Sequence, residues 1–333
     1  YSDSDFSEPK KYVKTDGPVE HDHTDVNEDG KCDVCGENVK VELSFYAVND
    51  LHGKFMDTDN QPGLDEFTTY LKDLYKDTAR EEILLSSGDM WQGTVESSSN
   101  KGQLMTEWMN EVGFASMTLG NHEYDWGANA LTPNSELAKF PFLAINVTYQ
   151  GKAVEYCQAS TTVEKGGAKI GIIGAIGNCL SSISGDYTPG LDFATGNALT
   201  ALVKTEATRL RNEEGCDFIV YSMHDGYGSS LSKITDFKNS DFVSEKGSKG
   251  YQYYDTALSD GYVDLVFEGH THQSYIIKDE YGVYHLQGGG ENRYISCADV
   301  SLNMARAEYT VKPRLISSRD YASNSIQDDP AIE

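Results

Sequence analysis

The sequence has little positive charge and no long apolar run. Its 333 residues contain 27 Lys and Arg against 53 Asp and Glu, which gives a formal net charge of −26. Such a surface repels nucleic-acid backbones and anionic membranes, so we expect no nucleic-acid polymer as a partner. Apolar runs such as KIGIIGAIG at 169–177 are far too short to cross a bilayer, so we expect no transmembrane segment.

Cysteine is also scarce, with six residues in the chain. Cys32 and Cys35 form a CxxC pair, whereas the other four are scattered and do not make a disulfide framework. We interpret those four as buried apolar side chains and leave their pairing open. The chain does not begin with Met and shows no signal peptide, so we expect a mature or trimmed form.

Composition divides the chain into three regions. Residues 1–40 are acidic and polar, and are expected to form a tail or a small appended module. Residues 41–316 carry regular apolar patterns and are expected to form the folded domain. Residues 317–333 are polar and are interpreted as a tail or the start of a linker.

The segment HDHTDVNEDGKCDVCG at 21–36 stands out within the first region. Three aspartates and an asparagine occupy positions 1, 3, 5 and 9 of a calcium loop, although Gly36 replaces the usual glutamate at position 12. Its two histidines and two cysteines also make a suitable zinc set. We predict a small calcium or zinc module, with a flexible acidic linker as the alternative. The candidate ligands are His21, His23, Asp25, Asn27, Asp29, Cys32, Asp33 and Cys35.

Strands and helices alternate from residue 41 onward. The run 41–48 predicts a strand, and the apolar positions of 64–75 fall on one helical face. From about 274 to 316 the pattern indicates successive antiparallel strands. This order predicts an α/β fold with a strand-rich C-terminal part. Further strands are expected at 81–87, 115–119, 169–175, 217–223 and 263–268. Further helices are expected near 104–112 and 197–212.

Five short polar motifs each follow a predicted strand immediately. Their oxygen and nitrogen donors suit zinc, manganese, iron or cobalt, and their glycines permit sharp turns. Ligands of open α/β sheets bind beyond the carboxyl ends of strands, so we expect the motifs to converge at one sheet edge. The motifs are NDLHG with Asp50 and His52, SGDMWQG with Asp89, LGNHEYD with Asn121 and His122, MHDG with His224, and EGHTH with His270 and His272.

The order DxH, GDxxxG, GNHE, HxG and GHxH resembles the calcineurin-like metallophosphatases. The stretches GNHEYDWG, FPFLAINV at 140–147 and KIGIIGAIG resemble the 5′-nucleotidase branch, which includes UDP-sugar hydrolases and 2′,3′-cyclic-nucleotide phosphodiesterases. The resemblance covers about residues 43–300. It implies an α/β sandwich of two mixed β-sheets flanked by helices, with 41–316 as the catalytic domain. Members of that branch normally carry a further C-terminal substrate-binding domain, so we expect either a catalytic domain taken from a longer protein or a single-domain relative.

The resemblance implies a centre of two divalent metal ions, Zn, Mn, Fe or Co. The implied ligands of one ion are Asp50, His52, Asp89 and His272. Those of the second are Asp89, Asn121, His224 and His270, so that Asp89 bridges both ions.

Three further roles follow from the GNHEYD motif. By resemblance, His122 would contact a phosphate oxygen or the leaving group, and Asp125 would orient His122 and favour its charged form. Glu123 is interpreted as structural.

The implied activity is hydrolysis of a small-molecule phosphoester, a nucleotide for a 5′-nucleotidase, by in-line attack of a metal-activated hydroxide with His122 assisting. The alternative within enzymes is a cyclic-nucleotide phosphodiesterase or UDP-sugar pyrophosphohydrolase. A catalytically silent extracellular binding protein on the same fold is the alternative from another class. Resemblance and composition favour an extracellular, periplasmic or cell-surface protein of a bacterium.

Overall fold

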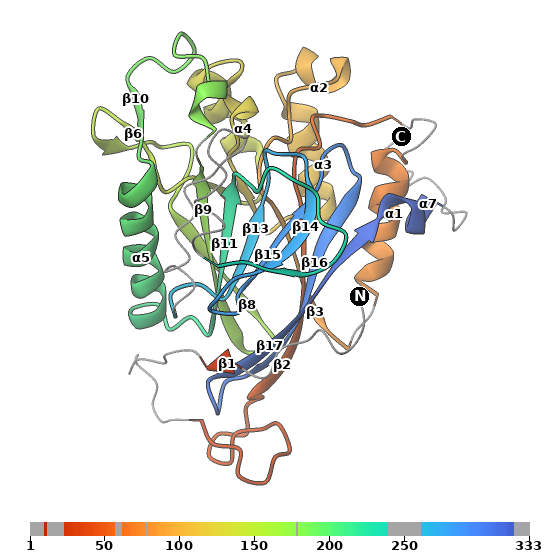
Figure 1. The fold of residues 1–333 in the computed structure, drawn as a ribbon, viewed down its shortest axis with the longest axis vertical. Coiled ribbons are helices and arrows are strands. Elements are labelled where there is room, and N and C mark those ends of the chain that lie inside the picture. Colours follow the sequence, from red (N-terminus) through yellow and green to blue (C-terminus); the bar gives the residue numbers. More distant parts are fainter. Residues whose placement is uncertain are drawn as a thin grey trace.

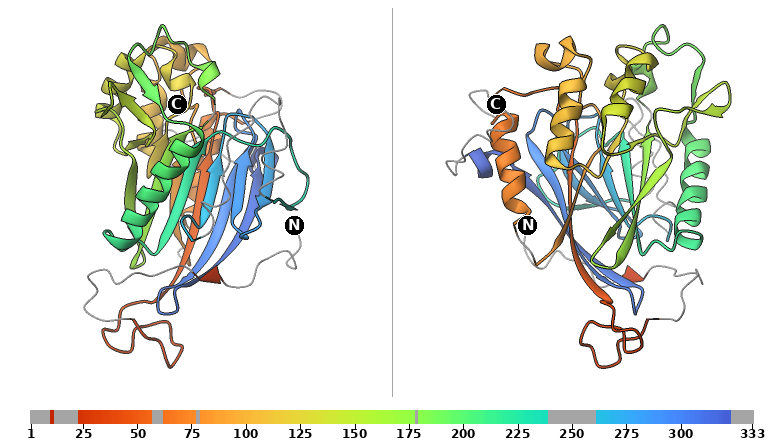
Figure 2. Two further views of the ribbon diagram at one scale, coloured as in Figure 1. Left: turned by 60° about the vertical axis from the view of Figure 1, so that its left-hand side comes forward. Right: turned by 180° about the vertical axis from the view of Figure 1, so that it is seen from behind.

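The computed structural model describes residues 10–11, 23–56, 62–76, 79–177, 179–238 and 261–322. Two seven-stranded mixed β-sheets stack on each other, and helices cover their outer faces (Figure 1, Figure 2). This sandwich confirms the fold class that the resemblance implied. Within the described ranges, no helix is both long enough and apolar enough to cross a membrane.

The first sheet has the strand order β1-β17-β16-β2-β3-β4-β5. Its strands β2 to β5 run parallel, whereas β16 pairs antiparallel with both β2 and β17. The strands are β1 (Lys10–Lys11), β2 (Lys40–Val48), β3 (Glu81–Ser86), β4 (Ser116–Thr118), β5 (Phe142–Leu143), β16 (Tyr294–Asn303) and β17 (Glu308–Ser317).

The second sheet has the order β12-β14-β15-β13-β11-β9-β8. Its central strands β9, β11, β13 and β15 run parallel, and β8 pairs antiparallel at the edge. The strands are β8 (Ser160–Lys165), β9 (Ala168–Ile176), β11 (Phe218–His224), β12 (Thr235–Asp236), β13 (Leu265–Glu268), β14 (Ser274–Lys278) and β15 (Tyr284–Gly288).

A small third sheet joins β10 (Leu191–Phe193), β6 (Val147–Tyr149) and β7 (Lys152–Ala153). The α-helices are α1 (Leu64–Leu74), α2 (Val95–Ser99), α3 (Gln103–Val112), α4 (Leu131–Leu137), α5 (Gly196–Asn212) and α7 (Ser318–Ala322). Short 3-10 helices lie at η2 (His122–Tyr124), η3 (Ala128–Ala130) and η4 (Leu180–Ser182).

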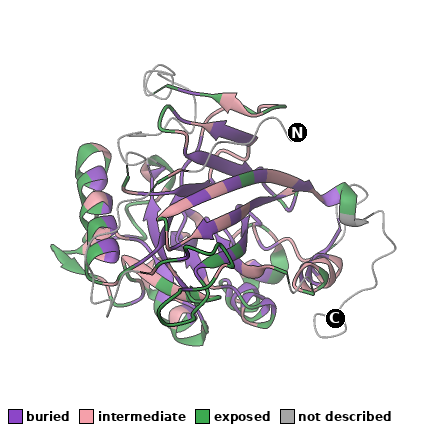
Figure 3. Ribbon diagram, turned by 90° about the horizontal axis from the view of Figure 1, so that it is seen from below, coloured by how far each residue is buried: buried purple, intermediate pink, exposed green. Residues whose placement is uncertain are grey.

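Strand alternation builds three apolar layers. In β2, Phe45 and Ala47 pack between the two sheets, whereas Tyr46 and Val48 face the layer that contains α1 and α3. In the second sheet, one face of β9 and β11 packs against the first sheet, and the opposite face packs against α5. The central strands of both sheets are therefore buried on both faces, as the purple strands of Figure 3 show, and this explains their near-continuous apolar runs.

The C-terminal strands differ from the simple antiparallel series that the sequence indicated. β14 and β15 form an antiparallel pair in the second sheet, whereas β16 and β17 form one in the first. The chain therefore crosses between sheets after β15, and β15 also pairs parallel with β13. The expected tail at 317–333 begins with β17 and α7, and residues 323–333 lie outside the described residues.

Candidate metal centre

The five polar motifs meet at one end of the sandwich. Three follow β2, β3 and β4 of the first sheet, and two lie at the ends of β11 and β13 of the second. The sequence predicted a single sheet edge, but the motifs come from two stacked sheets. Hydrogen bonds join them there: His224 Nδ1 lies 2.7 Å from the Ser87 carbonyl oxygen, and the His270 N–H donates to Asp50 Oδ2 at 2.9 Å.

Asp50, His52 and His272 form one cluster of donor atoms. Asp50 Oδ1 lies 3.2 Å from His272 Nε2 and 3.9 Å from His52 Nε2, and the two Nε2 atoms are 3.0 Å apart. Asp50 is fully buried, and its Oδ1 has no hydrogen-bond partner among the described residues. A buried, unpartnered carboxylate oxygen facing two imidazole nitrogens is the arrangement that a cation would satisfy.

The second cluster surrounds His224. Its Nε2 lies 3.0 Å from Asp89 Oδ2 and 3.2 Å from Asn121 Oδ1, and its ring centroid is 5.4 Å from that of His270. Potential ligand atoms of Asp50, Asp89 and His224 lie within 4.8 Å of one another, so the two clusters are contiguous. All seven predicted metal ligands therefore come together.

Backbone carbonyls set the orientation of two of the imidazoles. His52 Nδ1 lies 2.8 Å from the Gln92 carbonyl oxygen, as His224 Nδ1 does at 2.7 Å from that of Ser87. When each Nδ1 donates its proton to a carbonyl, Nε2 is left with the lone pair that a metal needs. Ser87 and Gln92 lie within the SGDMWQG motif, but they act through their backbone carbonyls, so the sequence singled out only Asp89 there.

The ligand loops are held in an unusual backbone conformation. Five of the seven candidate ligands have positive φ, between 52° and 67°. For residues with a β-carbon this region is sparsely populated and costs on the order of 1–3 kcal/mol per residue. Such strain persists only where the surroundings fix it, and it concentrates at functional sites. The five are Asp50, His52, Asp89, His270 and His272.

The charges of the cluster compensate one another. Burial opposes ionisation of Asp89, yet the positive His224 beside it holds the pKa of that carboxyl below its usual range. Burial also opposes the charge on His224, but Asp89 raises its pKa to about 10. Burial and the His224 charge lower the pKa of His270 to about 4, which keeps it neutral. A metal ion would replace the His224 proton and use the neutral ring as a ligand.

His122 and Asp125 form the pair that the sequence predicted. His122 Nδ1 lies 2.7 Å from Asp125 Oδ2, and the His122 backbone N–H donates to Asp89 Oδ1 at 2.8 Å. The His122 ring lies edge-on to that of His52, with centroids 5.1 Å apart. His122 therefore contacts the candidate metal ligands Asp89 and His52, but it belongs to neither of the two ligand clusters.

Glu123 is structural, as its position in the motif suggested. Its fully buried carboxylate accepts the backbone N–H groups of Asp89 at 3.0 Å, Met90 at 2.8 Å and Gly120 at 2.7 Å. These bonds fasten the loop after β3 to the loop after β4. Glu123 thereby fixes the position of Asp89 relative to Asn121.

Two residues that the sequence did not single out also lie at the centre. The Asn49 amide donates to Asp50 Oδ2 at 2.6 Å, and it stands within the NDLHG motif, of which only Asp50 and His52 were selected. Cys179 groups with His224 and His270, and it is fully buried. Burial raises the pKa of the Cys179 thiol well above its usual value, so it remains a neutral neighbour of the cluster.

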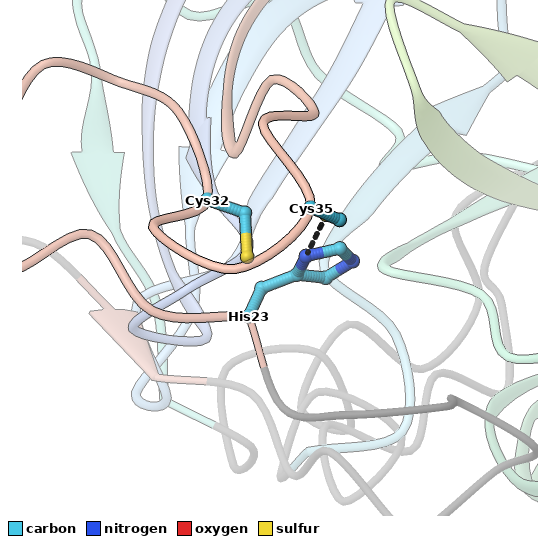
Figure 4. A group of neighbouring side chains, drawn as sticks. All are labelled: His23, Cys32 and Cys35. Carbon is cyan, nitrogen blue, oxygen red and sulfur yellow. Dashed lines mark hydrogen bonds between the residues drawn. The ribbon is translucent and has the colours of Figure 1, made fainter.

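In the N-terminal segment, the structure brings His23, Cys32 and Cys35 together (Figure 4). Burial of the sulfur opposes ionisation, but hydrogen bonds from the Cys35 backbone and from His23 outweigh it and lower the pKa of Cys32 to about 5. His21, the fourth member of the predicted zinc set, lies outside the described residues.

Several oxygens of the predicted calcium loop are engaged by its backbone or by Lys40, whereas the buried Asp25 Oδ1 has no hydrogen-bond partner among the described residues. Asp25 Oδ2 lies 3.1 Å from the Lys40 ammonium nitrogen. Asn27 Oδ1 accepts the backbone N–H of Asp29, and Asp33 Oδ2 accepts that of Val26 at 2.8 Å. The acidic residues thus stabilise the turns of the loop.

A pocket of about 800 Å³ lies beside the His122 loop, and Trp126, Tyr149 and Tyr187 are among its walls. None of the seven candidate ligands lines it. This pocket is therefore a neighbouring hollow and is separate from the metal centre.

Comparisons with known proteins agree with this geometry. The family model of the calcineurin-like phosphoesterases matches residues 43–274. An apyrase of Tabanus yao is 30% identical over 249 residues, which cover 69% of this chain and 39% of the apyrase. The snake venom 5′-nucleotidase of Gloydius brevicauda is 32% identical over 148 residues, which cover 40% of this chain and 25% of that protein. The chain thus spans well under half the length of these two relatives.

A solved structure supports the fold. The calcineurin-like phosphoesterase YfkN of Bacillus subtilis matches with a TM-score of 0.66 at 18% sequence identity. The match covers 88% of this chain and 95% of that chain.

The close approach at Gly120 provides a test of the donor cluster. A β-carbon at this position would lie 2.2 Å from Asp89 Oδ1, so Gly120→Ala must displace the carboxylate. We expect this variant to bind less divalent metal than the wild type, measured by elemental analysis of the folded protein. Gly185→Ala is the matched control, because a β-carbon there meets nothing within 4 Å. Equal metal content in both variants would show that Asp89 does not hold a metal.

The ion pair of His122 predicts a shifted titration. Although burial lowers the pKa of His122, the Asp125 hydrogen bond and the nearby acidic charges raise it to about 9. The charged ring therefore persists to about pH 9 and is lost as the pH rises through that value. Asp125→Asn should lower the titration midpoint by about 1–3 units, measured by NMR of the His122 ring in metal-free protein. The remote, exposed carboxyl variant Asp73→Asn should leave it unchanged, and a common midpoint in all three proteins would contradict the pairing.

Proposed function

The chain belongs to the calcineurin-like phosphoesterase family, and on this basis we propose that it is a metal-dependent phosphoester hydrolase of the 5′-nucleotidase type. The observation that carries the proposal is the convergence of seven side chains with oxygen and nitrogen donors in two contiguous clusters, one of which contains the buried Asp50 Oδ1 that accepts no hydrogen bond. Donor sets of this kind suit divalent ions such as Zn, Mn, Fe or Co.

Each ion would have its own set of ligands, and Asp89 would be shared. Bound there, two divalent ions would polarise a phosphate ester and lower the pKa of water. The side chains that would hold the first ion are Asp50, His52, Asp89 and His272. Those that would hold the second are Asp89, Asn121, His224 and His270.

His122 acts on the substrate, and Asp125 positions it. Because Asp125 engages Nδ1, His122 presents Nε2 to the ester, where a charged ring can donate a hydrogen bond to a phosphate oxygen or a proton to the leaving group. The hydrogen bond from the His122 backbone N–H to Asp89 holds His122 in a fixed position beside the metal cluster.

The proposed substrate is a nucleotide, with support from the apyrase and the 5′-nucleotidase among the relatives. The same metal clamp serves monoesters and diesters, so cyclic nucleotides and UDP-sugars are the alternative substrates. A silent binding protein is disfavoured because the seven donors and the His122–Asp125 pair are all present. The venom relative and the acidic surface support our proposal of an extracellular, periplasmic or cell-surface location.

A panel of phosphoesters tests the activity. We expect this chain to release phosphate in the presence of Mn²⁺, and release should stop with chelator. The panel is 5′-AMP, 2′,3′-cyclic AMP with a coupled phosphatase, UDP-glucose with the same coupling, and an aryl phosphate. Preference for 5′-AMP over the aryl phosphate would support a nucleotidase whose specificity lies in this domain. Metal-independent release, or none with any divalent ion, would contradict the proposal.

Two substitutions separate metal binding from catalysis. Asp89→Asn should abolish turnover and lower the content of both metals, because one carboxylate holds both. His122→Asn should keep the metals and lose about 10²–10⁴-fold in kcat, the usual contribution of a general acid or base. Elemental analysis and steady-state kinetics on the same preparations provide the comparison. Loss of both metals in His122→Asn would show that His122 is a ligand.

A further inference from the structure

The segment 23–38 lies far from the catalytic end of the sandwich. It precedes β2 and forms the loops at the bottom of Figure 1, whereas Asp50 follows the other end of the same strand. Nine residues of extended strand separate the two ends by about 30 Å. Any chemistry in this segment is therefore independent of the proposed phosphoesterase site.

A tight hairpin brings two cysteines close together. The Cys32 N–H donates to the Glu37 carbonyl oxygen at 2.7 Å, and the Gly36 N–H donates to the Cys32 carbonyl oxygen at 2.8 Å. Lys31 and Asn38 close the hairpin as a β-bridge. Gly36 has a φ of +77°, a conformation that glycine adopts without strain, so the turn after Cys35 depends on this residue.

His23 completes the cluster from the start of the segment. Its Nδ1 lies 3.6 Å from Cys35 Sγ, and a donor atom from each of His23, Cys32 and Cys35 lies within 4.8 Å of the others (Figure 4). A tetrahedral zinc ion with Zn–S of about 2.3 Å and Zn–N of about 2.0 Å places sulfur and nitrogen about 3.6 Å apart. The pair therefore already has the separation of two ligands on one ion.

The surroundings of Cys32 and His23 also suit a metal. Backbone hydrogen bonds from Thr24, Val34 and Cys35 reach the Cys32 sulfur, and such bonds stabilise a thiolate. The other ring nitrogen of His23, Nε2, faces Glu37 Oε2 at 3.9 Å. Metal-bound histidines commonly direct their second nitrogen to a carboxylate in this way.

The segment has almost no apolar core of its own. Cys32 is the one hydrophobic side chain in residues 23–38 that is buried, whereas Val26 is 85% exposed and Val34 is 69% exposed. Small loop-rich units of this kind depend on a crosslink or a metal for their stability. The three-residue cluster is the point at which such a link would join the start of the segment to its hairpin.

We propose that His23, Cys32 and Cys35 bind a zinc-class divalent ion that fastens residues 23–38 into a module separate from the catalytic centre. Thiolate and imidazole ligands select a softer ion than calcium. The carboxylates of the loop support this site indirectly, because they hold its turns and because Lys40 already neutralises Asp25. The ion has a structural role, and the fourth coordination position belongs to a ligand outside this set of three.

Cobalt titration of the full chain tests the site without any activity measurement. Metal-free protein reduced with a phosphine would be titrated with Co²⁺ and followed by the near-ultraviolet charge-transfer absorption of thiolate bound to cobalt. We expect this absorption in the wild type and its loss in the double variant Cys32→Ser with Cys35→Ser. Asp89→Asn should retain it, because that change affects only the catalytic donors.

Elemental analysis supplies the second measurement. After zinc loading, the double variant should hold one zinc equivalent fewer than the wild type, with the same main thermal unfolding transition. An unchanged transition shows that the sandwich still folds, so a lost equivalent reports on the module alone. Absence of the absorption in the reduced wild type would overturn the proposal. A Cys32–Cys35 disulfide in protein purified without reductant, found by peptide mapping, would also overturn it.

Discussion

Two fully buried carboxylates, those of Asp50 and Asp89, lie at the end of the sandwich where the carboxyl ends of strands from both sheets come together. The surrounding structure has to compensate their charge. Burying an ionised carboxylate in a protein is costly unless it is paired or bound to a metal. Imidazoles from both sheets supply part of that pairing, as His224 does for Asp89 and His272 for Asp50. Asp50 Oδ1 accepts no hydrogen bond even though His272 Nε2 lies 3.2 Å away, so a cation between these groups would complete the pairing.

The positions of these carboxylates and imidazoles depend on loops whose conformation is stabilised by contacts from other parts of the chain. Left-handed backbone at Asp89 is unfavourable, and the Glu123 carboxylate offsets it by accepting the N–H groups of Asp89 and Gly120, which lie in two different loops. Gly120 leaves room for the Asp89 carboxylate beside it. The apolar layers on both faces of each sheet then keep the strand ends, and with them the loops, in fixed positions.

The two ends of β2 carry donor sets of different chemical character. At the carboxyl end, carboxylates, an amide and imidazoles form a mixed oxygen and nitrogen cluster that suits hydrolytic metal ions. At the amino end, two sulfurs and one imidazole form a soft cluster on a segment with little apolar core. The sandwich holds the first cluster in place, whereas we propose that metal binding at the second cluster stabilises the fold of residues 23–38.

The sequence alone determined the chemistry, because motifs such as NDLHG and EGHTH place donor residues directly after apolar strands, and local patterns report this. It also predicted the role of Glu123 and the His122–Asp125 pair, whose members are three residues apart. Only the tertiary structure decided that the motifs come from two sheets and that the strands at 274–316 divide between them. Backbone partners such as Ser87 and Gln92 likewise emerged only there. Sheet stacking and backbone contacts depend on residues distant in the chain, which no local periodicity records.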